Sequence, residues 1–384
     1  NMLDKIIIIS WSNYDQRIGD QFDVLYLINN GYVVEYWDVS NITIPGYSVK
    51  NCIPPEGLVN VKFENKKEFI GRVNKERHSY FIVYMNCCPK SFFCYRILSK
   101  FNCFQIYCVN GVLPAVSKIT RYSQYIRILS LDNILQIFQK IIFSLLLNTK
   151  LIRPVNILLK TCDIASNKGG CKINDKTKVF PFNTLDFQQT LLQNNVDPFP
   201  NERYIVFLDQ YLPFHPDNKM RGINYDPSDY FMQMNHFFNR IEEKLSCKVI
   251  IAGHPAVEDR QSYCTYFNGR KVVYDNTMVL IKNSIATIAH FSTAVSYSVI
   301  FKKKIFFVFS EDMKNTSPLQ YSMGNNISSM LKSRIIELNN KSNFDIDFDL
   351  DINLAAYDNY KHLYLVNRDS QNEQNGKLLI DSIS

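Results

Sequence analysis

The sequence lacks any apolar stretch long enough to cross a membrane as a helix, which takes about 18 residues. The nearest approach, residues 134–147 (ILQIFQKIIFSLLL), is interrupted by Gln136, Gln139 and Lys140. We expect a buried helix there, with a helix resting on a membrane surface as the alternative. Residues 5–10 (KIIIIS) are too short for the core of a signal peptide. We therefore expect a cytoplasmic protein, peripheral at the inner membrane face if 134–147 contacts lipid.

Cysteine spacing of the metal-binding kind is also missing. The ten Cys residues include no C-x-x-C pair; Cys87 and Cys88 are adjacent, and the others are scattered. Cys103 and Cys108 lie in an apolar run, where a free thiol behaves as a small hydrophobic side chain. The pattern argues against a disulfide scaffold and predicts a reducing compartment.

No concentrated block of one charge is present. Lys plus Arg number 43 and Asp plus Glu 36, which gives a net charge of +7, and the densest basic run is Lys302-Lys303-Lys304. Because no nucleic-acid-binding motif accompanies this excess, we do not expect nucleic acid as a partner. A small anionic donor molecule or an anionic membrane surface accounts for the balance equally well.

The sequence does contain two sets of short apolar strands that alternate with amphipathic helices. The first set predicts strands at 5–10, 32–39, 80–85 and 103–109, with helices at 20–31 and 90–100. The second predicts strands at 204–208, 248–252, 271–274, 285–289 and 304–309, with helices at 227–245, 278–283 and 294–300. Such alternation is typical of parallel sheets covered by helices. We predict an α/β protein with two Rossmann-like domains that face each other across a cleft.

The domain boundaries follow from these two sets. We expect a first domain at residues 1–150, a second domain at 201–345, and a tail at 346–384 that returns towards the first domain. Between the domains we expect a linker or transition segment at 151–200, with strands at 155–160 and 178–182 and a helix at 186–193. Ligands of open α/β sheets bind outside the carboxyl ends of the strands. The residues that directly follow predicted strands are therefore the candidates for a site.

The tripeptide Gly253-His254-Pro255 follows the predicted strand KVIIA. Glycine lets a ligand approach the backbone closely, and histidine can bind a phosphate oxygen or donate a proton. A turn with an incidental histidine is the alternative. A second candidate, Ser292-Thr293, follows the strand at 285–289 and precedes a predicted helix. It is either a simple helix cap or an anion site made of hydroxyls and free backbone N–H groups.

The third candidate is Asp209, which follows the strand YIVFL. A carboxylate at the mouth of a cleft can act as a general base on a hydroxyl; its alternative role is to bind loop amides. His215 and Asp217 form a second polar cluster in the loop that follows.

The order and spacing of Asp209, His254-Pro255 and Ser292-Thr293 resemble those of bacterial sialyltransferases and related capsule and lipopolysaccharide transferases of GT-B fold. The resemblance covers residues 178–310, and the N-terminal half shares only the general α/β pattern. The acidic motif departs from the usual acidic pair plus glycine, since it reads Leu208-Asp209-Gln210. This departure affects the base assignment more than the phosphate site.

The resemblance implies metal-independent transfer of a keto-sugar acid from its CMP donor to a hydroxyl of a bacterial surface glycan or lipid-linked oligosaccharide. The sugar would be sialic, pseudaminic or legionaminic acid, or Kdo. The first domain would bind the acceptor and the second the donor. In this scheme Asp209 takes the proton and His254 assists departure of CMP. The other implied contacts are the phosphate at Gly253, Pro255, Ser292 and Thr293, the nucleoside at Asn276 and Thr277, and the cleft at Ser10, Asn13, His215 and Asp217.

Other functions remain open at this point. UDP- or GDP-sugar transferases or epimerases and CDP-polyol phosphotransferases are alternatives on the same fold, and a non-catalytic glycan-binding subunit is an alternative of another class. No metal or other cofactor is expected. The alternating run Asp345-x-Asp347-x-Asp349-x-Asp351 invites a metal interpretation, but its spacing places the carboxylates on one side of an extended segment. We favour a solvated edge or linker there.

Overall fold

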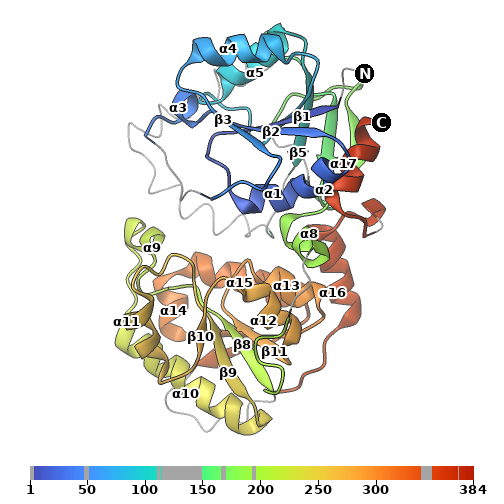
Figure 1. Ribbon diagram of the computed structural model, residues 1–384. Coiled ribbons are helices and arrows are strands. Elements are labelled where there is room, and N and C mark those ends of the chain that lie inside the picture. Colours follow the sequence, from blue (N-terminus) through green and yellow to red (C-terminus); the bar gives the residue numbers. More distant parts are fainter. Residues whose placement is uncertain are drawn as a thin grey trace. The chain divides into compact units, whose positions relative to one another are not determined.

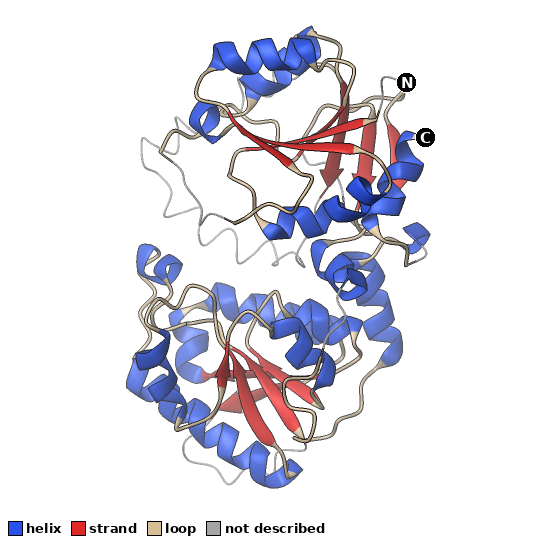
Figure 2. Cartoon of the chain, viewed as in Figure 1, coloured by secondary structure: helices blue, strands red, loops and turns tan. Residues whose placement is uncertain are grey.

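The computed structural model forms two compact α/β units, shown in Figures 1 and 2. Unit 1 contains residues 4–109, 149–192 and 362–384 of the described chain, and unit 2 is built mainly from residues 196–361. The predicted α/β fold with two Rossmann-like domains is confirmed by the two all-parallel sheets. The residues that the structure describes are 4–46, 52–109, 114, 149–165, 170–192, 196–338, 348–370 and 372–384.

Unit 1 contains a seven-stranded parallel sheet in the order β3-β2-β1-β4-β5-β6-β7. Its interior strand β1 contains four consecutive isoleucines, as suits a strand that is covered on both faces. Ile7 and Ile9 pack into the hydrophobic core on one face, and Ile6 and Ile8 into that on the other. The strands are β1 (Lys5–Ser10), β2 (Val33–Asp38), β3 (Val59–Lys62), β4 (Tyr80–Val83), β5 (Phe104–Val109), β6 (Ile157–Lys160) and β7 (Lys178–Pro181).

One helix prediction in unit 1 is wrong. The segment 20–31 was expected to form a single helix, but two short helices meet at Asp23, whose backbone is left-handed with a φ of 51°. A left-handed residue cannot continue a right-handed helix. The described helices of unit 1 are α1 (Gln16–Phe22), α2 (Val24–Asn29), α3 (Ser40–Thr43), α4 (Lys66–Lys75), α5 (Phe92–Lys100), α8 (Leu185–Leu192) and α17 (Asn375–Ile383), with a 3₁₀ turn at Arg368–Ser370. A π-helix at Lys361–Leu365 begins at the last residue of unit 2.

The segment 151–200, expected to be a linker, supplies β6, β7 and α8 to unit 1. The C-terminal helix α17 belongs to the same unit. Buried asparagines tie these segments together: Asn375 Oδ1 accepts a hydrogen bond from the amide of Asn183 (2.9 Å), and Asn375 Nδ2 donates to the carbonyl of Gln21 (2.7 Å). These are long-range contacts, so local sequence pattern does not reveal them.

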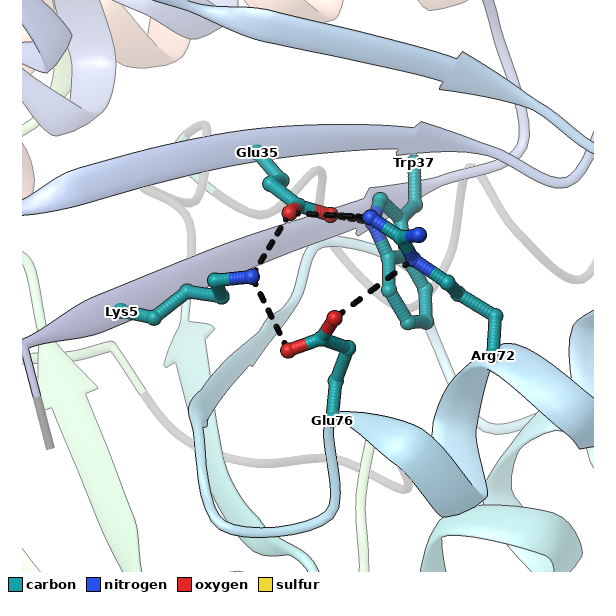
Figure 3. Close-up of polar contacts among 5 residues, drawn as sticks. All are labelled: Lys5, Glu35, Trp37, Arg72 and Glu76. Carbon is teal, nitrogen blue, oxygen red and sulfur yellow. Dashed lines mark hydrogen bonds and ion pairs between the residues drawn. The ribbon is translucent and has the colours of Figure 1, made fainter. Parts of the chain in front are cut away.

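Four charged side chains form a closed network at the amino-terminal edge of the unit 1 sheet (Figure 3). The carboxylate of Glu35 accepts from Lys5 Nζ at 2.9 Å, from Trp37 Nε1 at 2.8 Å and from Arg72 at 3.1 Å. Lys5 also bonds Glu76 at 2.9 Å. Burial alone would raise the pKa of Glu35, but these hydrogen bonds outweigh it and the pKa is lowered.

Unit 2 contains a six-stranded parallel sheet in the order β10-β9-β8-β11-β12-β13. The predicted strands at 204–208 and 248–252 and the helix at 227–245 are confirmed at both ends. The strong helix boundary has a local cause, because Asp226 caps the helix and Pro227 opens it. The strands are β8 (Tyr204–Leu208), β9 (Lys248–Ala252), β10 (Val272–Val273), β11 (Ala286–Ala289), β12 (Lys304–Ser310) and β13 (Ile335–Leu338).

The helices of unit 2 connect these strands. Buried aromatic side chains of α10 and α11, among them Phe238 and Tyr263, pack in one core with Phe207 of β8. The helices are α9 (Pro216–Met220), α10 (Pro227–Leu245), α11 (Arg260–Cys264), α12 (Thr277–Asn283), α13 (Val295–Ile300), α14 (Glu311–Thr316), α15 (Pro318–Met330) and α16 (Leu354–Tyr360), with a 3₁₀ turn at Thr265–Phe267.

The structure bears only partly on the predictions about the membrane segment and the cysteines. The segment 134–147 lies outside the described residues. Among the helices that are described, none is long and apolar enough to cross a membrane. None of the ten cysteines, all of which lie within the described residues, forms a disulfide.

Candidate functional site

The three candidate motifs lie at one edge of the unit 2 sheet. Strands β9, β8 and β11 are neighbours and all parallel, so the residues that follow them meet at the carboxyl edge. The loops are joined there by hydrogen bonds. The amide of Asp209 donates to the carbonyl of Ala252 (3.1 Å), and the amide of Phe291 donates to Gln210 Oε1 (2.9 Å).

Asp209 is a buried carboxylate that organises two of these loops. It is 5 % exposed. Its Oδ1 accepts from the amide of Tyr211 (3.0 Å) and the hydroxyl of Tyr263 (3.1 Å), and its Oδ2 accepts from the amide of His254 (3.3 Å). Burial raises the pKa of Asp209 to about 6 although these hydrogen bonds lower it. The contacts correspond to the loop-binding role that the sequence left open, and they leave the general-base role as a prediction.

His254 is held in a defined tautomer by its own loop. The ring is half-buried, and its Nδ1 accepts a hydrogen bond from the amide of Ala256 at 3.2 Å. An atom that accepts from N–H carries no proton, so in the neutral ring the proton sits on Nε2. Burial, and then the neighbouring ring of His215, lower the pKa of His254. The side chain therefore presents a neutral N–H donor at the carboxyl edge.

His215 and Asp217 come from the loop after β8, at the start of α9. His215 is the N-cap of this helix, and its Nδ1 accepts from the amide of Asp217 at 3.1 Å. The rings of His215 and His254 lie edge to face with their centroids 5.1 Å apart. The structure thus brings together two residues that the sequence proposed separately. The side chain of Asp217 is exposed.

Gly253 has a packing role in the structure, and its expected contact with a ligand stays a prediction. The sequence suggested close approach of a ligand to its backbone. In the structure a Cβ at this position would lie 2.4 Å from the ring of Tyr274, so an aromatic side chain of the protein fills that space. Tyr274 is in turn covered by the guanidinium of Arg260, 4.2 Å from the ring centroid. The glycine is required by packing, whereas Pro255 is exposed.

Ser292 and Thr293 lie before the short helix α13, which begins at Val295. The Oγ of Ser292 accepts from the amide of Ala294 at 3.2 Å, a serine turn that uses one acceptor and leaves the hydroxyl hydrogen available. Thr293 is exposed.

The nearby His290 is fully buried between Tyr230 and the carbonyl of Val308, and burial lowers its pKa to about 4. His290 is thus a neutral core residue.

The remaining candidates lie at two places. Asn276 is exposed and directly precedes α12, and Thr277 is the first residue of that helix, after β10 at the same carboxyl edge. Ser10 and Asn13 belong to unit 1 and follow β1. Ser10 is 2 % exposed, with its Oγ 3.3 Å from the Oγ of Ser12.

Sequence reasoning missed Tyr263, Gln210 and Tyr274. Tyr263 donates to Asp209, Gln210 holds the loop of Ser292, and Tyr274 packs on Gly253. The chain contains 23 tyrosines, so the residue type alone could not identify Tyr263 and Tyr274 as members of the site. Gln210 had a signal, since it stands where the acidic pair of the resembling families would continue.

Two further features bear on the site. No group of three or more His, Cys, Asp or Glu side chains within the described ranges could hold a metal ion. Of the aspartate run, Asp345 and Asp347 lie outside those ranges, and Asp349 accepts from the amide of Asp351 at 2.9 Å. A cavity of about 330 Å³ lies at the opposite, amino-terminal edge of the unit 2 sheet, beside the ion pair of Arg270 with Glu242.

Comparison with known proteins gives structural likeness only. No family model and no curated protein matches the chain. The UDP-GlcNAc 2-epimerase of Methanocaldococcus jannaschii is similar at 12% identity and a TM-score of 0.48, over 99% of this chain and 99% of that one. The calicheamicin glycosyltransferase CalG4 is similar at 7% identity and a TM-score of 0.44, over 98% and 94%. At these values the likeness carries no argument about activity.

Proposed function

We propose that this protein is a glycosyltransferase that takes a sugar from a nucleotide-activated donor and binds the donor phosphate at the carboxyl edge of the unit 2 sheet. The observation that carries the proposal is the half-buried ring of His254, whose Nδ1 is used by the backbone while its Nε2–H is left to donate. A hydrogen-bond donor that is already held in place before the reaction is suited to stabilising the negative charge on a leaving phosphate.

The finer proposal follows the resemblance of the motifs, and its donor is a CMP-activated keto-sugar acid. The bond between the anomeric carbon and the phosphate oxygen breaks, and its electron pair stays on the phosphate. The oxygen of an acceptor hydroxyl forms the new bond to that carbon. Its proton passes to Asp209, whose pKa of about 6 suits a base near neutral pH. His254 and Ser292 donate to the leaving phosphate, with Thr293 beside them.

The nucleoside is assigned to Asn276 and Thr277, which lie at the same edge as the proposed phosphate site. The acceptor, a surface glycan or a lipid-linked oligosaccharide, is assigned to Ser10 and Asn13 of unit 1. These assignments make no use of a metal ion. UDP- and GDP-sugars remain the alternative donors, and the nucleotide itself is what the first experiment identifies.

Calorimetric titration with CMP, CDP, UDP and GDP, with and without EDTA, tests the proposal. We expect CMP to bind with or without EDTA, and His254→Ala and Ser292→Ala to weaken it. His236→Ala, at an exposed position of α10, is the matched control and should bind as the wild type does. Binding of UDP or GDP in place of CMP would contradict the proposed CMP-sugar donor. Absence of binding for all four nucleotides would contradict the proposed glycosyltransferase function. Full turnover in Asp209→Asn would exclude the base assignment.

A further inference from the structure

Two histidines from separate loops meet at the carboxyl edge of the unit 2 sheet. His254 follows β9, and His215 precedes α9 in the loop after β8, the neighbouring strand. Their ring centroids are 5.1 Å apart with an interplanar angle of 70°. Both rings are half-buried, so each is partly withdrawn from water but still reachable by a ligand.

The backbone holds both rings in the same tautomer. His215 Nδ1 accepts from the amide of Asp217 at 3.1 Å, and His254 Nδ1 accepts from the amide of Ala256 at 3.2 Å. Neither Nδ1 can then carry a proton, so each neutral ring carries its proton on Nε2. No other residue in the described part of the chain forms a hydrogen bond with either Nε2. The pair therefore offers two N–H donors on rings whose centroids are 5.1 Å apart.

This arrangement suits an anion and not a metal ion. A histidine that binds a metal through Nε2 carries its proton on Nδ1 and donates it to an acceptor behind the ring. Here each Nδ1 accepts a hydrogen bond from a backbone N–H, whereas in a metal-bound histidine Nδ1 donates one. The carboxylates of the same two loops are engaged elsewhere or exposed: Asp209 accepts from the amide of His254, and Asp217 is exposed. Neither neutralises the two ring donors.

We propose that the Nε2–H groups of His215 and His254 together bind the phosphate that leaves with the nucleotide when the sugar is transferred. The inference rests on the proposed function and adds His215 to its site. Two donors on one phosphate distribute the charge that develops as the bond to the sugar breaks. The same chemistry serves a nucleoside monophosphate or diphosphate, because both present phosphate oxygens.

The test uses substitutions that keep the loop and remove the donor. In His215→Asn the side-chain oxygen can still accept from the amide of Asp217, and asparagine is a favoured N-cap, so α9 keeps its start. His254→Asn does the same for the amide of Ala256. His236→Asn, at an exposed position of α10, is the control. Each purified variant is titrated calorimetrically with CMP and UDP, and with cytidine and uridine as phosphate-free probes.

We expect His215→Asn and His254→Asn each to weaken binding of the nucleotide about tenfold, the size of one hydrogen bond to a charged group. Binding of the matching nucleoside should stay the same. His215→Gln is the second variant. Its amide nitrogen lies near the former Nε2, so it should recover most of the lost affinity even if the Asn variant is poorly folded.

Three outcomes would overturn the inference. In the first, the wild-type protein binds a nucleotide and His215→Asn binds it as tightly as His236→Asn does. This result would show that His215 is not part of the site, and it would not contradict the proposed function. Equal losses for nucleotide and nucleoside, or for the Asn and Gln variants, show that shape and not the N–H donor matters. Wild-type protein that binds no nucleotide removes the proposed function as well.

Discussion

Glu35 in unit 1 and Asp209 in unit 2 are both buried carboxylates of a parallel sheet, and their partners differ. Glu35 accepts from two cations, Lys5 and Arg72, and from the indole of Trp37. The donors to Asp209 in the described part of the chain are neutral, among them the backbone amides of Tyr211 and His254 and the hydroxyl of Tyr263. The pKa of Glu35 is accordingly lowered, whereas burial raises that of Asp209 to about 6.

The comparison separates a structural cluster from the proposed functional site. Around Glu35 every charge has a counter-charge within the network, so the cluster stabilises the fold and offers nothing to a ligand (Figure 3). Asp209 has no cation and serves to hold the loop of His254 in place. The N–H donors of His215 and His254 at this edge are left for a molecule from outside, as the proposed phosphate site requires. Three stability measurements would break or sharpen this distinction.

The largest effect is expected for Glu35→Gln. Lys5 and Arg72 would keep only Glu76 as a counter-charge, and the loss of one partner from this partly buried network costs about 3 kcal/mol in the free energy of unfolding. The midpoint of urea unfolding at pH 7 measures it. Glu56→Gln, at an exposed position, is the control and should change stability by less than about 0.5 kcal/mol. A loss as small as the control's would mean that the network is not structural.

A pH series should separate the two carboxylates. The pKa of Asp209 is raised in the folded state, so between about pH 4 and pH 6 folding takes up a proton and stability falls as pH rises, by up to about 3 kcal/mol. Glu35 has the opposite sign: its contribution is present above its unfolded pKa and is lost as pH falls through its lower folded pKa. Subtracting the stability of Asp209→Asn from that of the wild type isolates the first effect. A difference independent of pH would contradict it.

The smallest effect is expected for Tyr263→Phe. The variant removes one hydrogen-bond donor from Asp209, so it should cost about 1 kcal/mol at pH 8. Because that donor lowers the pKa of Asp209, the cost should shrink towards pH 4, where the carboxyl is protonated. Tyr266→Phe, on the neighbouring turn and 39% exposed, is the control. Equal costs at both pH values would show that the hydroxyl acts on packing and not on the carboxylate.

Local pattern predicted the elements of unit 2 well because their signals are complete within a few residues. The strand at 204–208 is a short fully buried run, and the helix at 227–245 has its cap and its proline in sequence order. The same reasoning failed at Asp23, where one left-handed residue divides a helix; aspartate adopts this conformation more often than most residues, but its type alone does not require it.

The sequence by itself determined the two α/β sets and the position of each candidate at the end of a strand, since periodicity and burial are properties of neighbouring residues. Only the tertiary structure decided that 157–181 completes the first sheet, that Tyr274 fills the space over Gly253, and that His215 meets His254. The physical reason is the order of the strands. Packing of distant segments sets that order, and the order decides which loops share an edge.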